Sequence, residues 1–201
     1  MARRVLLSEL RLGTISASLY CLEARLCEFG VNGIIGLDVL RHQTCLKNSK
    51  IGEVLNDNKL TIDFTSRTIR FGRSEHLEYS VPMENDPRQI IVAANILGHP
   101  LHLAVDTGAG LTTLFSGPHS IWIDRLLPFV QFRELPTLDG DCRAREVLLP
   151  YIELGDCSWG WVAGLVIDTR MQPTDGLLSV HTLRLKILHF DFDNHIMSWN
   201  R

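Results

Sequence analysis

The chain has 201 residues, of which 45% are hydrophobic and 21% are charged, a composition typical of a soluble globular protein with one or two small domains. A net charge of −3 gives no indication of a nucleic-acid or anionic-membrane partner, and no apolar run approaches the ~18–20 residues of a membrane span. The 5 cysteines are odd in number and contain no Cys-x-x-Cys pair, which favours reduced thiols over a disulfide framework.

The first part of the chain, residues 1–72, alternates apolar runs with polar turns. Its motif NGIIG at residues 32–36 is followed by a short stretch, residues 37–41, that we expect to be helical. The first residues hold no apolar run of signal-peptide length, so the chain as it stands is expected to be cytoplasmic, whereas a longer parent could be exported. Residues 73–87 are polar, carry prolines near their end and are expected to form a linker.

The second part, residues 88–201, opens with two apolar runs, residues 89–95 and 101–106, separated by a Gly-His-Pro turn. This pattern predicts a β-hairpin. The second run ends in the most informative motif of the chain, DTGA at residues 106–109.

Later segments of this part also read as short strands between turns. A brief helix is expected around residues 121–127, and the Asp-Gly pair within residues 138–141 is a strong signal for a tight turn. Apolar and β-branched runs predict a mainly-β domain and occupy residues 147–149, 151–154, 161–167, 185–192 and 196–199.

Several segments of the first part recur in the second in the same order and at nearly constant spacing. Such a long period predicts a duplicated domain rather than a solenoid. The paired segments are residues 2–7 with 144–149, Leu12-Gly13 with Leu154-Gly155, residues 33–40 with 176–183, and residues 62–64 with 190–192.

On these motifs the chain resembles the pepsin/retropepsin superfamily of aspartic peptidases, and is most like the bacterial retropepsin-like aspartyl proteases. DTGA at residues 106–109 is similar to the active-site loop of the family, and DGLLS at residues 175–179 to the hydrophobic–hydrophobic–Gly segment that passes that loop. The resemblance implies a mainly-β fold in which residues 88–201 form a complete β-barrel lobe. Residues 1–72 would then be the C-terminal half of a first, truncated lobe.

The resemblance also implies an aspartic endopeptidase with Asp106 as a catalytic residue, acting on a peptide or protein substrate without a metal or cofactor. In this chemistry two carboxylates about 3 Å apart share a proton. One activates a water as general base while the other polarises the scissile carbonyl. Thr107 would bond the backbone of the opposite lobe, Gly108 would let the two active-site loops meet, and Ala109 would keep their approach close.

Two further elements follow from the resemblance. Leu177, Leu178 and Ser179 would support the active-site loop, although Ser179 stands where the family has glycine. A serine adds a Cβ and a hydroxyl to a crowded place, which argues against activity. A flap covering the substrate would have its tip at Asp139-Gly140.

The chain contains only one Asp-Thr-Gly, so the second aspartate has to come from elsewhere. A homodimer could supply it, but residues 1–72 would occupy the place of the partner lobe. We therefore expect the chain to be a truncated form of a two-lobed parent that lacks the first half of the N-terminal lobe, or the product of a misplaced start codon at Met1. The competing hypothesis is a catalytically inactive peptidase-like module that holds extended peptides by strand addition.

Overall fold

The structure, a computed structural model of the chain, describes residues 3–12, 15–23, 47–48, 58–72, 75–86, 89–117, 120–137, 140–169 and 173–201. For the strands before residue 58 the description covers the backbone and its pairing. The described residues are mostly strand, with one α-helix among them, α2 (Ser120–Leu126). The mainly-β expectation is therefore confirmed, as is a short helix near residues 121–127.

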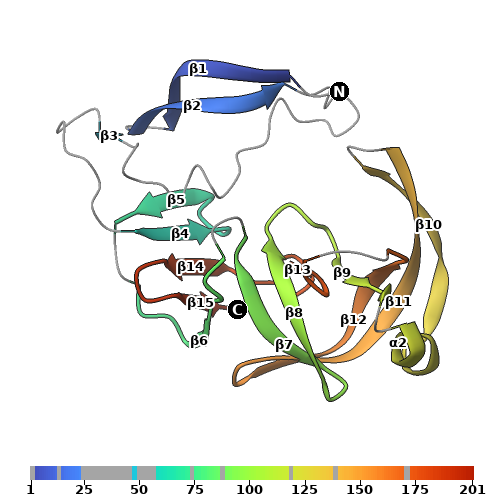
Figure 1. The fold of residues 1–201 in the computed structure, drawn as a ribbon. Helices are drawn as coiled ribbons and strands as arrows, with labels where there is room; N and C mark the ends of the chain where they lie inside the picture. The colour runs from blue at the N-terminus through green and yellow to red at the C-terminus, as the bar shows by residue number, and fades with distance from the viewer. Residues whose placement is uncertain are drawn as a thin grey trace.

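The strands form three sheets (Figure 1). The first contains β1 (Arg3–Leu12), β2 (Ile15–Glu23) and β3 (Lys47–Asn48). The second contains β7 (Ile91–Ile96), β8 (His99–Asp106), β9 (Thr112–Phe115), β10 (Phe129–Thr137), β11 (Gly140–Leu154), β12 (Cys157–Ile167) and β13 (Gly176–Ser179). The third contains β4 (Lys59–Asp63), β5 (Thr68–Phe71), β6 (Tyr79–Pro82), β14 (Ile187–Asp191) and β15 (Ile196–Asn200).

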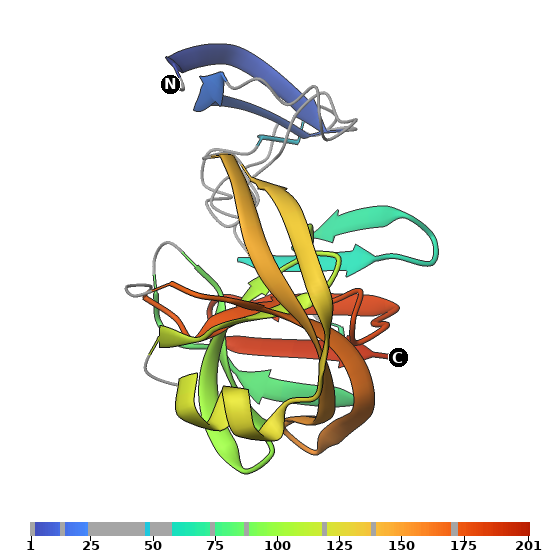
Figure 2. The same ribbon diagram turned by 90° about the vertical axis from the view of Figure 1, so that its right-hand side faces the viewer.

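The second sheet closes on itself as a barrel (Figures 1 and 2). Its strand order is β10-β11-β12-β9-β13-β8-β7, and β7 pairs again with β11 through Ile96 and Ile152. Closure leaves few free strand edges, and buried side chains such as Val92, Leu103 and Leu149 belong to its core. Strand β10 lies outside the closed ring and extends it from β11.

The predicted hairpin at the start of the barrel is confirmed as β7 and β8. Its turn consists of Leu97 and Gly98, both at positive φ, the backbone of a tight hairpin turn. The runs 147–149 and 151–154, expected as separate strands, are parts of the single strand β11. The helix expected at residues 37–41 lies outside the described residues.

Strand β13 lies between β8 and β9, parallel to β8 and antiparallel to β9. Because β8 and β9 follow one another in the chain, the loop between them has to cross the end of β13, at Ser179. The packing is closest at the start of β13, where a Cβ on Gly176 would stand 2.1 Å from the carbonyl oxygen of Thr113. The position of β13 beneath the crossing loop is therefore tightly constrained.

The five-stranded sheet has the order β5-β4-β14-β15-β6 and joins strands from both parts of the chain. Its side chains alternate between two faces, as strand geometry requires. One face is apolar and belongs to the hydrophobic core of the barrel, with Leu60, Phe190 and Trp199 fully buried. The other face carries polar side chains, among them the buried Thr61 and His189.

Two hairpins of this sheet have the same construction. Thr61 of β4 pairs with His189 of β14, 128 residues further along the chain, and the same spacing relates every residue of the β4 turn to one of the β14 turn. Asp63 accepts a hydrogen bond from the Ser66 N–H at 2.9 Å, and Asp191 accepts one from the Asn194 N–H at 3.0 Å. Each turn then ends in a residue at positive φ, Arg67 at 55° and His195 at 54°.

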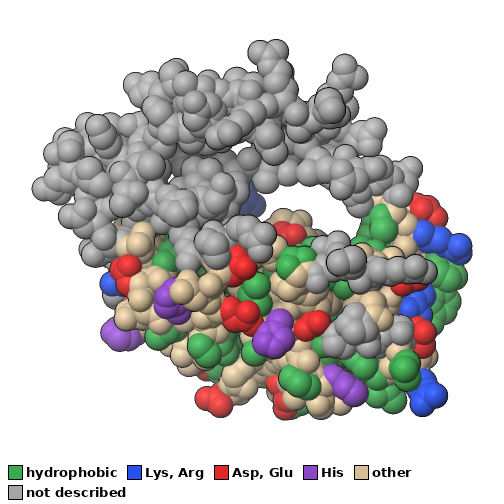
Figure 3. All heavy atoms as spheres, viewed as in Figure 1, with side chains coloured by type: hydrophobic (Ala, Val, Ile, Leu, Met, Phe, Trp, Pro, Cys, Tyr) green, Lys and Arg blue, Asp and Glu red, His purple; other side chains and the backbone are tan. Residues whose placement is uncertain are grey.

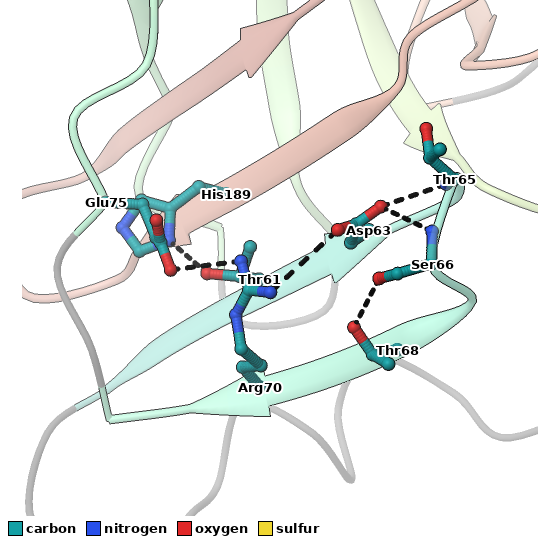
Figure 4. Close-up of polar contacts among 8 residues, drawn as sticks. All are labelled: Thr61, Asp63, Thr65, Ser66, Thr68, Arg70, Glu75 and His189. Atoms are coloured by element: carbon teal, nitrogen blue, oxygen red, sulfur yellow. Dashed lines mark hydrogen bonds and ion pairs between the residues drawn. The ribbon is translucent and has the colours of Figure 1, made fainter.

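Because Thr61 pairs with its own counterpart, a local two-fold relationship passes between β4 and β14. Figure 4 shows the polar side chains around this point. The Thr61 hydroxyl lies 2.8 Å from Nδ1 of His189, and Arg70 of β5 forms ion pairs with Glu75 at 3.0 Å and with Asp63 at 3.9 Å. Strands from the two parts of the chain are thus joined by side chains as well as by the backbone.

Residues 73–87, expected to be a linker, contain strand β6, which pairs with β15 from Tyr79 to Pro82. At least this part of the segment therefore belongs to the five-stranded sheet. The division into a partial lobe at residues 1–72 and a complete lobe at residues 88–201 stays a prediction.

Strands β1 and β2 form a hairpin that lies apart from the barrel in both views (Figures 1 and 2). The last paired residues before its turn are Leu12 and Ile15. In the barrel, hairpin β11–β12 closes in the same way on Leu154 and Cys157. None of the helices among the described residues is long and apolar enough to cross a membrane.

Candidate functional site

Asp106 is the last residue of β8, and its half-buried carboxylate is held by the loop that follows. Its Oδ1 accepts hydrogen bonds from the backbone N–H groups of Gly108 at 2.8 Å and Ala109 at 3.1 Å. Within the described part of the chain, no group donates to Oδ2. One oxygen therefore fixes the orientation of the carboxylate, while the other is open to a water molecule or a second carboxylate.

The glycine at position 108 is not required by its own lobe. A Cβ built there would meet only Oδ1 of Asp106, at 3.4 Å, which is an ordinary contact, and its φ lies outside the left-handed region. A Cβ on Gly110 would meet nothing within 4 Å. The Thr107 hydroxyl, for its part, makes no hydrogen bond to another described residue. The tip of this loop thus has room at both glycines and carries a hydroxyl that no described residue bonds.

The structure brings the predicted supporting segment directly to the loop that carries Asp106. Ser179 lies next to Asp106 in the parallel pairing of β13 with β8. Leu178 is buried in the core, and Leu177 is half-buried beside Thr113 of β9. The candidate residues, which are some 70 positions apart in sequence, therefore lie side by side in the fold.

Ser179 does not crowd the loop as the sequence predicts. Its side chain is completely buried, and its hydroxyl donates to the carbonyl oxygen of Ala109 at 2.6 Å and accepts from the Thr182 N–H at 3.2 Å. The serine is accommodated because both of its polar neighbours are hydrogen-bond partners.

Hairpin β10–β11 occupies the position predicted for the flap. Thr137 pairs with Gly140, so Gly140 begins β11, while Asp139 lies outside the described residues. The hairpin carries most of the basic side chains on the face seen in Figure 3, at the right-hand edge. Glu146 of β11 accepts hydrogen bonds from Arg133 and Gln131 of β10, each at 2.6 Å. These two bonds, the arginine first, hold the pKa of Glu146 below its usual value.

Asp175, just before β13, ties the start of this strand to His102 in β8. Its carboxylate accepts from the His102 N–H at 2.7 Å, and its own N–H donates to the His102 carbonyl at 2.9 Å. The His102 ring contacts Glu84, which raises the pKa of the imidazole. His99 instead stacks on Trp122 with ring centroids 4.4 Å apart. Among the described residues, no group of three or more His, Cys, Asp or Glu is arranged to hold a metal.

Sequence reasoning missed two residues that contact this segment, Thr112 and Thr182, and it gave no role to Asp175 of the motif at residues 175–179. Thr112 N–H donates to the Thr182 hydroxyl at 2.8 Å, and the Thr112 hydroxyl accepts from the Ser179 N–H at 3.1 Å. The only signal was that Thr112 and Thr182 each stand three residues from a motif position, which does not by itself reveal a contact.

No family model and no curated protein matches the chain. Among solved structures it is similar to a retropepsin-like aspartic protease from Rickettsia conorii, at 18% identity and a TM-score of 0.46 over 61% of this chain and 90% of that one. It is also similar to EIAV protease complexed with the inhibitor HBY-793, at 18% identity and a TM-score of 0.38 over 50% of this chain and 90% of that one. The basic 7S globulin from soybean aligns with 92% of this chain at 16% identity and a TM-score of 0.50.

At such identities a structural likeness concerns the fold alone. The soybean alignment runs through both parts of the chain, which spans 62% of the length of that globulin. The observed strands and sheet topology confirm the predicted mainly-β fold, and they are consistent with a retropepsin- or pepsin-like fold.

Proposed function

We propose that the chain provides one catalytic lobe of an aspartic endopeptidase, in which Asp106 acts with a second aspartate. The observation that carries the proposal is the carboxylate at the end of β8, held at Oδ1 by its own loop and open at Oδ2. A second carboxylate close to Oδ2 would share a proton with it. The pair would activate a water for attack on a peptide carbonyl, without a metal.

The tip of the loop has features that favour the approach of a second active-site loop from the opposite side. Gly108 has no packing reason for being glycine within its own lobe, and Thr107 offers a hydroxyl that no described residue uses. Both features are explained if a second loop approaches from the other side, with its backbone against Gly108 and its polar groups at Thr107. Hairpin β10–β11 would cover the peptide in this arrangement, with its tip at Asp139 and Gly140.

A homodimer of two Asp106-containing lobes is disfavoured by the five-stranded sheet, where β4 already occupies the edge of β14. The equal turns of β4–β5 and β14–β15, and the matching hairpins β1–β2 and β11–β12, support an internal repeat. We therefore propose that the second aspartate belongs to a lobe that includes residues 1–72. Further sequence of a longer parent or a partner chain would complete it.

Activity is tested with a fluorogenic peptide library at acidic pH, on the chain together with the longer parent sequence or partner chain that completes its first lobe. The wild type, Asp106→Asn and the control Asp156→Asn are compared in this form. Asp156 is exposed in the β11–β12 turn. We expect cleavage that Asp156→Asn retains, Asp106→Asn abolishes and a statin-type transition-state mimic inhibits. Cleavage that survives Asp106→Asn would rule out the aspartic mechanism.

Mixing wild-type and Asp106→Asn chains identifies the source of the second carboxylate. If it comes from a lobe built on residues 1–72, activity falls in proportion to the wild-type fraction. If two Asp106 residues meet in a homodimer, activity falls with the square of that fraction.

The second candidate function is a peptidase-like module that binds extended peptides without cleaving them. The single Asp-Thr-Gly of the sequence favours it, because one carboxylate cannot form the pair. A strictly monomeric chain that binds a statin-type peptide mimic, but shows no cleavage at any acidic pH, would support this function over the peptidase.

A further inference from the structure

Ser179 stands at the point where the active-site loop crosses the barrel. It is the last residue of β13, lies beside Asp106 in the sheet and is completely buried. Because β13 is fixed between β8 and β9, a side chain at this place can transmit its position to the loop above.

The Ser179 hydroxyl connects that loop to the segment after β13. It donates to the Ala109 carbonyl oxygen at 2.6 Å and accepts from the Thr182 N–H at 3.2 Å. Buried backbone groups without partners are costly, and this one hydroxyl satisfies two of them.

Two threonines close the connection into a ring. The Ser179 N–H donates to the Thr112 hydroxyl at 3.1 Å, and the Thr112 N–H donates to the Thr182 hydroxyl at 2.8 Å. Thr112 is completely buried and begins β9, so these bonds fasten the loop in its middle, at Ala109, and at its end, at Thr112. Hydrogen-bond networks of this kind fix side chains more firmly than separate bonds do.

We propose that Ser179 is a positioning residue, which holds the Ala109 peptide so that the backbone N–H groups of Gly108 and Ala109 stay directed at Oδ1 of Asp106. This role rests on the proposed function in its catalytic consequence. A glycine at position 179 has no group that could bond Ala109 or Thr182. The serine therefore replaces the open space expected there by a direct bond to the loop that carries the carboxylate.

This role predicts an unusual order of loop stability and activity among variants at position 179. In Ser179→Ala the methyl group occupies the site and leaves the Ala109 carbonyl and the Thr182 N–H unpaired. In Ser179→Gly the space left by the side chain, with these two polar partners, can hold a water molecule. We expect loop order and kcat to fall in the order serine, glycine, alanine, with kcat of Ser179→Ala reduced about tenfold or more and KM little changed.

Amide hydrogen exchange by NMR tests the positioning without relying on activity. We expect Ser179→Ala to speed exchange at Gly108, Ala109 and Thr182 about tenfold beyond its effect on the barrel core. Ser116→Ala is the matched control, because Ser116 is a buried serine whose hydroxyl bonds Asp168 at 2.9 Å, away from the loop. It should leave exchange at Gly108 and Ala109 unchanged.

Thr182→Val keeps the side-chain shape, removes the acceptor of the Thr112 N–H and serves if Ser179→Ala does not fold. It should speed exchange in the loop in the same direction. Unchanged exchange at Gly108 and Ala109 in both variants would overturn the proposal, as would a kcat of Ser179→Ala equal to that of Ser116→Ala. Faster loop exchange in a wild-type background that shows no Asp106-dependent cleavage would uphold the positioning and count against the peptidase function instead.

Discussion

The Thr61 hydroxyl and Nδ1 of His189 lie 2.8 Å apart in the middle of the five-stranded sheet, although 128 residues separate them in the chain. Both side chains are buried, with His189 only 3% exposed. Burial lowers the pKa of the imidazole, while Asp191 and Glu75 act in the opposite direction and Lys59 adds to the lowering. The folded chain therefore favours the neutral ring at the junction of its two parts.

This pKa predicts acid sensitivity of the sheet. A histidine whose pKa is lowered by folding stabilises the protein above the ordinary value of 6.5, and that stabilisation is lost as the pH falls from there through the folded pKa. His189→Gln removes the titration but keeps a partner for Thr61. Between about pH 7.5 and pH 5 we expect the free energy of unfolding of the wild type to fall by about 1 kcal/mol more than that of the variant.

Urea denaturation at the two pH values measures this difference, with His76→Gln as the control because His76 is exposed. The contact of His102 with Glu84 raises the pKa of His102. It is present in the wild type and in both variants, so its contribution to the pH dependence cancels in the comparison. Equal pH dependence of the wild type and His189→Gln would contradict the prediction.

Gly108→Ala distinguishes the stability of the chain itself from the approach of a second active-site loop. The added Cβ meets only an ordinary contact of 3.4 Å within the chain, so the free energy of unfolding should change by less than about 0.5 kcal/mol. If an opposite loop approaches Gly108, cleavage should fall at least about a hundredfold, since a methyl group would displace it. Thermal unfolding and the cleavage assay on the same preparation decide the matter, and retained activity would argue against a second loop at this place.

Gly176→Ala should damage the fold itself. Its Cβ would stand 2.1 Å from the Thr113 carbonyl oxygen and 3.1 Å from the Leu114 Cα, backbone atoms that β13 cannot avoid while paired to β9. We expect destabilisation of about 3 kcal/mol or more. Gly160→Ala is the control, because its nearest neighbour lies at 3.5 Å; similar stability of the two variants in urea would show that β13 is not confined as described.

The matching turns after β4 and β14 predict that a glycine substitution in each of them stabilises the protein by a similar amount. Arg67 and His195 adopt left-handed backbone angles that favour glycine. Arg67→Gly and His195→Gly should each raise the free energy of unfolding by about 0.5 kcal/mol, and the two effects should add because the turns lie at opposite ends of the paired strands β4 and β14. Thr65→Gly, in the first turn but without positive φ, should instead lower stability; a rise there would point to a different cause.

Much of the fold was accessible from local patterns. The β7–β8 hairpin follows from two apolar runs around a glycine, and the end of β8 at Asp106 from a short motif after an apolar run. Strand β11 was divided in the prediction because Pro150 interrupts its apolar run. The structure continues the pairing on both sides of that residue, from Leu149 to Tyr151, since tertiary contacts outweigh a local signal.

The site was less accessible, because its decisive contacts join distant residues. The side chain of Ser179 was expected to clash, since the sequence gives its identity but not the direction of its hydroxyl. Only the crossing of the loop over β13 reveals that the Ala109 carbonyl and the Thr182 N–H lie within its reach. Strand β6 was hidden in the same way, as its partner β15 lies at the far end of the sequence.

The pair of unlike residues at the centre of the sheet, Thr61 and His189, has a consequence for how copies of the chain could pair with one another. If two copies of the chain instead paired β4 with β4, or β14 with β14, the contact would become threonine against threonine or imidazole against imidazole. Neither combination reproduces the bond of Thr61 with His189, and a second imidazole would need more room in a buried site. The contact of Thr61 with His189 therefore favours pairing of β4 with β14 over pairing of either strand with its own kind from another copy.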